Sequence, residues 1–123
     1  MNSKLKQYSI LLVRVVIGLA FVAAGMAKLA GVEMMVATYE TIGVGQWFRY
    51  LTGVIEVGAA ILLFVPGKQA WGGLLLLCTM IGAVLAHLFI LGPGTAPAVI
   101  LGLASALVVY SYRLQLPLFK AHG

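Results

Sequence analysis

Four long apolar runs, separated by short polar connections, dominate the pattern of hydrophobic and polar positions along this chain. They cover approximately residues 8–30, 47–65, 70–91 and 98–113. A helix needs about 20 mostly apolar residues to cross a bilayer, so the pattern predicts four transmembrane helices. Helices also satisfy their own backbone polar groups inside lipid. We therefore expect an all-α integral membrane protein, a four-helix transmembrane bundle that forms one domain over residues 1–123.

The segment between the first two runs, residues 31–46, is too polar and too rich in glycine to span a bilayer. It combines apolar and acidic side chains, namely Met34, Met35 and Tyr39 with Glu33 and Glu40. This mixture is typical of a short amphipathic helix that lies in the membrane interface. We expect such an interfacial helix between the first two spans.

Composition strengthens the membrane prediction, because 63% of the residues are hydrophobic and only 9% are charged. A soluble domain carries roughly 25% charged residues. Four spans leave no room for a nucleotide-binding or other extramembrane module. The net charge of +5 belongs mostly to residues that flank the apolar runs, so no nucleic-acid partner is expected. The single cysteine, Cys78, excludes an intrachain disulfide and a self-contained CxxC redox centre.

The basic residues also predict an orientation. On one side of the predicted bundle lie Lys4, Lys6, Lys68, Arg113 and Lys120, and on the other the one basic loop residue is Arg49. The positive-inside rule then places both termini in the cytoplasm. A cleaved signal peptide is an alternative, because Lys4 and Lys6 precede an apolar stretch with Ala23-Ala24-Gly25 downstream. The run is long for a signal peptide, so we favour a span.

The first run carries two cations on one helical stripe. At ~100° per residue, the stripe includes Arg14, Gly18, Phe21, Gly25 and Lys28. Glycines let a neighbouring helix approach closely, so this stripe is expected to face the bundle interior. Arg14 and Lys28 lie about 21 Å apart along the helix axis, near opposite sides of the bilayer.

Three ionisable residues are expected at a similar depth in the external half of the bundle. Successive spans run in opposite directions, which brings Lys28, Glu56 and His87 to that level. An ionised group near a helix centre costs about 2.5–3.5 kcal/mol on insertion scales, so Glu56 needs a partner and Lys28 is the natural one. His87 changes charge near neutral pH and suits a proton relay or a ligand hydrogen bond. Thr79 precedes His87 by two turns on the same face.

The sequence therefore predicts a buried polar cluster or ligand site formed by Lys28, Glu56 and His87, with Arg14, Gly18, Gly25 and Thr79 in support. A structural role is the alternative. Arg14 and Lys28 lie close enough to an interface to snorkel, Glu56 would lock two helices as an ion pair, and His87 would bond a neighbouring helix. No metal site is expected, because His87 and His122 fall on opposite sides.

One pattern resembles the opening signature of the DoxX family, and it lies in the first run: Leu12-x-Arg14-x-x-x-Gly18-x-x-Phe21-x-x-x-Gly25-x-x-Lys28-Leu29. Gly53-x-x-Glu56-x-Gly58 and His87 fall where that family has an intramembrane acid and a polar residue. The resemblance implies a small multi-pass protein of the bacterial inner (plasma) membrane. It also implies a subunit of a membrane-associated oxidoreductase that is linked to quinones or sulfur compounds.

Two functions remain open at this stage. In the first, the cluster of Lys28, Glu56 and His87 binds a quinone, and electrons come from a partner, because the chain shows no cofactor motif. The second is a non-catalytic accessory, assembly or chaperone-like component of a larger complex, and a small transporter is a weaker third reading. The sequence does not decide whether the chain is an enzyme. The expected partners are the lipid bilayer and either membrane redox proteins or further copies of the chain.

Overall fold

Helices make up all regular structure in the part of the chain that the computed structural model describes, residues 3–117. In chain order they are α1 (Ser3–Ala30), α2 (Glu33–Ile42), α3 (Trp47–Leu62), α4 (Gln69–Ala86), the π-helical turn η1 (His87–Leu91), α5 (Ala96–Ser111) and the 3-10 turn η2 (Arg113–Gln115). The predicted all-α class is confirmed, and a short helix, α2, occupies the segment between the first two runs. Lys120 and His122 lie outside the described residues.

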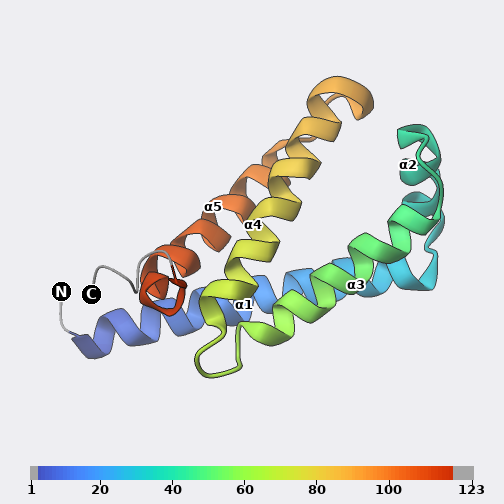
Figure 1. Ribbon diagram of the computed structural model, residues 1–123. Helices are drawn as coiled ribbons and strands as arrows, with labels where there is room; N and C mark the ends of the chain where they lie inside the picture. The colour runs from blue at the N-terminus through green and yellow to red at the C-terminus, as the bar shows by residue number, and fades with distance from the viewer. Residues whose placement is uncertain (1–2, 118–123) are drawn as a thin grey trace.

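Two helical hairpins form the molecule (Figure 1). One pairs α1 with α3 and the other pairs α4 with α5, and they meet where α3 turns into α4. From that junction the hairpins diverge into two arms. At the open end, α2 contacts both α3 and η1, so it lies between the tips of the arms.

Glycines set the spacing within the first arm. A Cβ atom on Gly25 of α1 would lie 2.9 Å from the carbonyl oxygen of Gly53 on α3, and the reverse distance is 3.0 Å. Only glycine allows two backbones to approach this closely. Nearer the junction, Gly18 lies under the ring of Phe64. The structure thus places Gly18 and Gly25 on the buried face of α1.

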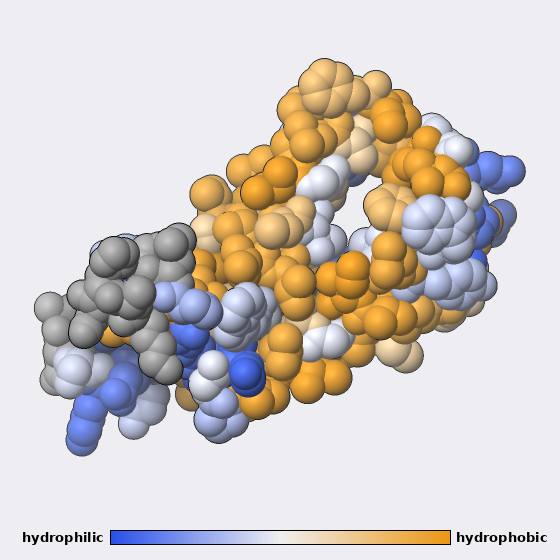
Figure 2. All heavy atoms as spheres, viewed as in Figure 1, coloured by the Kyte–Doolittle hydropathy of each residue, from blue (hydrophilic) through white to orange (hydrophobic). Residues whose placement is uncertain are grey.

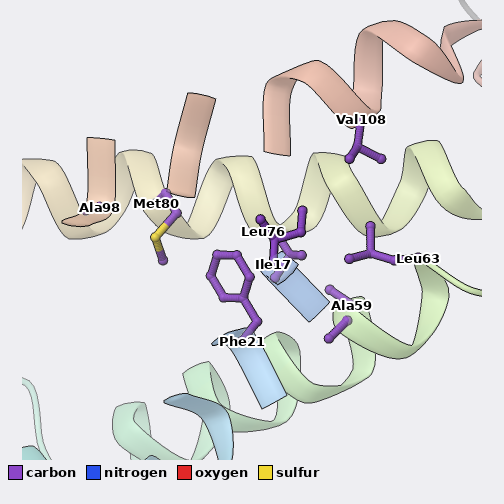
Figure 3. Close-up of a cluster of buried hydrophobic side chains, with 9 residues drawn as sticks. Ile17, Phe21, Ala59, Leu63, Leu76, Met80, Ala98 and Val108 are labelled. Carbon is purple, nitrogen blue, oxygen red and sulfur yellow. The ribbon is translucent and has the colours of Figure 1, made fainter. Parts of the chain in front are cut away.

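The hydrophobic core lies at the junction of the two arms (Figure 3). Three large side chains in it are completely buried, namely Phe21 from α1, Leu63 just beyond the end of α3 and Leu76 from α4. Gly72 brings α4 against α3, since a Cβ there would lie 2.6 Å from the carbonyl oxygen of Ala59. The remaining core members are Ile17, Ala59, Ala60, Met80, Ala98 and Val108.

Polar bonds reinforce the junction. The side chain of Gln115 in η2 accepts a hydrogen bond from the backbone N–H of Ala70 at 2.9 Å and donates one to Gln69 at 2.7 Å. These bonds satisfy groups at the start of α4 that no helical partner reaches. The C-terminal end of α5 is thereby tied to the beginning of α4.

Apolar side chains cover most of the face seen in Figure 2, and hydrophilic residues gather toward its two ends. Two helices are long and apolar enough to cross a membrane, α1 and the continuous helix Gln69–Leu91. The helix α5 is apolar but shorter. The helix α3 has 16 residues, about 24 Å, because the chain turns soon after Leu62. The hydrocarbon core of a bilayer is about 30 Å thick, so two of the four predicted spans meet the length criterion.

We predict that Gly25→Ala destabilises the protein. The new Cβ would lie 2.6 Å from a Val57 methyl carbon and 2.9 Å from backbone, so α1 and α3 must separate. Such overpacking typically costs about 1–3 kcal/mol. The measurement is unfolding of the purified protein in mild detergent.

Gly58→Ala is the matched control, since nothing lies within 4 Å of the position of its Cβ. It should be neutral or stabilising by up to about 1 kcal/mol, the difference in helix propensity. Equal destabilisation by both substitutions would contradict the close contact at Gly25.

Candidate functional site

A cavity of about 470 Å³ opens between the two arms, bounded by α2, α3, α4 and η1. Figure 2 shows this hollow, with its apolar rim and paler, more polar side chains deeper inside. Most lining groups are apolar, including Met35, Leu51, Leu75 and Leu91. The polar lining residues are Lys28, Thr38, Tyr39, Thr52, Glu56, Cys78, Thr79 and His87.

The predicted partners Lys28 and Glu56 form an ion pair in the wall of this cavity. Lys28 Nζ lies 2.7 Å from Glu56 Oε1, and the side chains are 13% and 1% exposed. Lys28 belongs to the last turn of α1 and Glu56 to the middle of α3. The close approach of Gly25 to Gly53, one helical turn before each residue, brings the two charges into contact.

Arg49 holds the end of α1 in place. This residue lies in the first turn of α3, is only 4% exposed, and donates hydrogen bonds to the backbone carbonyl of Lys28 and, at 2.8 Å, to Gln46 Oε1. The last carbonyls of a helix lack partners and carry the negative end of its dipole, so a buried guanidinium is stabilised there. The sequence prediction used Arg49 only as a marker of orientation and missed this role.

Tyr39 is the second residue that the sequence prediction missed. It lies on α2, is 7% exposed, lines the cavity and packs edge-on against Phe48 at 5.8 Å between ring centroids. Burial raises the pKa of its phenol, and the charge of Glu56 raises it further, although Thr52 and Arg49 act in the opposite direction. The spacing of Met35, Tyr39 and Ile42, all lining residues, was the available signal for a cavity-facing stripe.

His87 lies on the other arm, at the first position of η1. Its Nδ1 atom is 3.3 Å from the carbonyl oxygen of Gly92, and the backbone N–H of Gly92 donates to the carbonyl of His87 at 2.8 Å. Thr79 lies two turns earlier and donates its hydroxyl proton to the carbonyl of Leu75 at 2.8 Å. Both side chains line the cavity.

The structure therefore brings Lys28 into contact with Glu56 and places His87 and Thr79 on the same cavity. Gly25 lies one helical turn before Lys28, where α1 contacts α3. Whether these residues act together as a functional site stays a prediction. Among residues 3–117, no group of three His, Cys, Asp or Glu side chains is arranged to hold a metal ion.

Arg14 and Gly18 are not among the lining residues of the cavity. Arg14 donates a hydrogen bond to the carbonyl of Leu63 at 2.8 Å, and its guanidinium lies 5.5 Å from the ring centroids of Phe64 and Tyr112. Gly18 makes room for the same Phe64 ring. These two residues thus stabilise the junction of the arms rather than the candidate site.

We predict that Lys28→Met is strongly destabilising, by about 3–5 kcal/mol, because it leaves Glu56 buried without its partner. The double variant Lys28→Met/Glu56→Gln should recover at least half of that loss, since it removes both charges. The measurement is a double-mutant cycle of unfolding in detergent.

Lys68→Met is the control, a change of the same kind at an exposed turn, and should alter stability by no more than about 0.5 kcal/mol. If the double variant loses as much unfolding free energy as the two single variants lose together, the two charges are not coupled.

Comparison with known proteins identifies the family of the chain. The chain matches the DoxX-like family over residues 12–110, which covers α2 to α4 in full and most of α1 and α5. It is 31% identical over 75 residues to a Bacillus subtilis (strain 168) protein named "Putative oxidoreductase CatD". That match covers 61% of this chain and 56% of the relative, so the chain spans about half of the relative's length. No solved structure matches.

The family match includes the pattern from Leu12 to Leu29 on which the resemblance rested, together with Glu56 and His87. It covers most of the chain and coincides with two helices of membrane-spanning length. This chain is a membrane protein and belongs to the DoxX-like family.

Proposed function

We propose that this protein is a subunit of a membrane-associated oxidoreductase and that the cavity between its arms binds a small redox-active molecule. The observation that carries the proposal is the cavity itself. About 470 Å³ of largely apolar space contains an ion pair on one wall and an imidazole on another. Cavities that bind small molecules have this size, are mostly apolar and contain few polar groups.

The chemistry of the lining favours a quinone-type or sulfur-containing ligand. A quinone is an apolar ring with two carbonyls, and it needs apolar walls with a few hydrogen-bonding groups. Lys28, Tyr39 and His87 provide such groups. Ionisable residues inside a membrane protein are costly and commonly mark functional sites. The name of the Bacillus subtilis relative, an oxidoreductase, agrees with redox chemistry.

Electrons would reach the ligand from a partner protein in this proposal. The sequence contains one cysteine, so a thiol pair within the chain is excluded. The chain would bind the ligand and control its protons, and a redox protein associated with it would supply or remove electrons. Copies of the chain itself are the other partner that we propose.

The proposed topology has four spans in a bacterial inner membrane, with both termini in the cytoplasm. Support comes from the charges at the two ends of the bundle. At one end, Lys4 and Lys6 lie at the start of α1, Lys68 lies between α3 and α4, and Arg113 follows α5. At the other end, Glu33 and Glu40 belong to α2. An excess of Lys and Arg marks the cytoplasmic side. The spans α3 and α5 are short for a bilayer of average thickness, which local thinning accommodates at modest cost.

A non-catalytic accessory role is the second candidate, and a groove outside the main cavity favours it. This groove of about 240 Å³ lies between α4 and α5 and is lined only by apolar residues and Gly102, among them Leu77, Ile81, Leu85 and Leu103. A helix of a larger complex would fit a surface of this kind. In that case the Lys28–Glu56 pair would fix the packing of α1 on α3.

The test uses duroquinone, a fully substituted benzoquinone that cannot add to the thiol of Cys78. Protein purified in mild detergent is expected to bind it, as measured by a rise in thermal stability and by native mass spectrometry. The double variant Lys28→Met/Glu56→Gln should weaken binding at least tenfold, because the polar wall is lost.

Ser105→Ala is the control, because Ser105 is buried between helices, bonds the carbonyl of Leu101 and does not line the cavity. It should bind duroquinone as the unaltered protein does. Two results together would favour the accessory role. Duroquinone would not stabilise the protein, and the chain would associate with a partner complex even when it carries Lys28→Met/Glu56→Gln.

A further inference from the structure

The contact of His87 with Gly92 is a hydrogen bond in one of the two neutral tautomers of the ring. A carbonyl oxygen only accepts hydrogen bonds, so the 3.3 Å contact of Nδ1 with the Gly92 carbonyl is such a bond when the proton is on Nδ1. In the neutral ring Nε2 is then an acceptor. The Nδ1–Cε1 edge lies against the turn at Gly94, and no hydrogen bond joins Nε2 to another residue in the described part of the chain. In this tautomer His87, a lining residue of the cavity, keeps an unused acceptor.

Several other polar groups of the cavity wall already have partners within the protein. Three threonine hydroxyls donate to carbonyls of their own helices at 2.8 Å, namely Thr38, Thr52 and Thr79. The ammonium of Lys28 is neutralised by Glu56 at 2.7 Å. The cavity therefore has no unpaired cation for an anionic ligand, while Nε2 of His87 still lacks a donor.

We propose, building on the ligand cavity of the proposed function, that the site selects a neutral aromatic ring with a hydroxyl group, a phenol or hydroquinone type of ligand, whose O–H is donated to Nε2 of His87. The apolar walls take the ring, and the hydroxyl satisfies an acceptor that the protein leaves open. A dione in the same pose would face Nε2 with a carbonyl oxygen, two acceptors without a proton between them. An oxyanion would enter a largely apolar cavity whose ammonium group is already paired with Glu56.

Cys78 supplies a built-in reporter of cavity occupancy. It is the single cysteine of the chain, it is exposed, and it belongs to the lining of the cavity. A molecule bound there slows alkylation of the thiol by N-ethylmaleimide, which intact-protein mass spectrometry follows directly. The reporter requires no substitution, so the experiment uses the natural chain in mild detergent.

The test compares two probes that differ only at the hydroxyl, 2-naphthol and its methyl ether, 2-methoxynaphthalene. We expect 2-naphthol to protect Cys78 at a concentration about three- to tenfold lower, the gain from one hydrogen bond. In His87→Leu the two probes should protect Cys78 at about equal concentrations. Partitioning of the probes into micelles is the same for both proteins, so it does not affect the change in the ratio of protective concentrations. Naphthalene-2-sulfonate should give no protection.

Ser105→Ala is the control, because Ser105 is buried, does not line the cavity and leaves the acceptor of His87 intact. It should keep the preference for 2-naphthol. If His87→Leu does not fold, His87→Phe, which also lacks the acceptor, takes its place in the same comparison.

Equal protection by 2-naphthol and its ether, with protection by duroquinone, would overturn the hydroxyl selectivity and leave the proposed function standing. Protection by the sulfonate at similar concentrations would overturn the preference for a neutral ligand. If duroquinone and both naphthalene probes leave alkylation of Cys78 unchanged, the cavity binds no ring and both proposals fail.

Discussion

The contact between Gly25 and Gly53 is the constraint on which the rest of the structure depends. At this point the backbones of α1 and α3 are so close that each carbonyl oxygen occupies space which a Cβ would need. One turn further along each helix, the same closeness holds the ammonium of Lys28 against the carboxylate of Glu56. A buried ion pair is stable only when its geometry is this good, so the glycines are a condition for having charges in the wall at all.

Two arginines then tie α1 and α3 together near opposite ends of the first arm. Arg14 on α1 donates to Leu63, just beyond the end of α3, and Arg49 on α3 donates to Lys28, near the end of α1. Each places positive charge at the negative end of the neighbouring helix dipole. The second arm joins the first at the core around Phe21 and Leu76, and the space between the arms is left for the cavity.

Sequence reasoning located the helices from the apolar runs, and it found the Lys28–Glu56 pair because the alternating direction of the spans sets the depth of each charge. It described Arg49 as a loop charge and Tyr39 as part of an interfacial helix, since their burial depends on where α2 lies against α3. It grouped Arg14 with the site because both cations share one stripe of α1, whereas the divergence of the arms separates them. The cavity and the divergence are tertiary features that no spacing of residues encodes.

The π-helical turn at residues 87–91 makes the geometry of the cavity depend on chain length. A hydrogen-bonded ring of this kind contains one residue more than an α-helical turn. Loss of one residue between Leu88 and Leu91 would leave an ordinary α-helix and would rotate the following connection by about 100° relative to α4. His87 would keep its place in the sequence and lose its bond to Gly92. During evolution, a change in the number of residues here would therefore alter the site more than most changes in their identity.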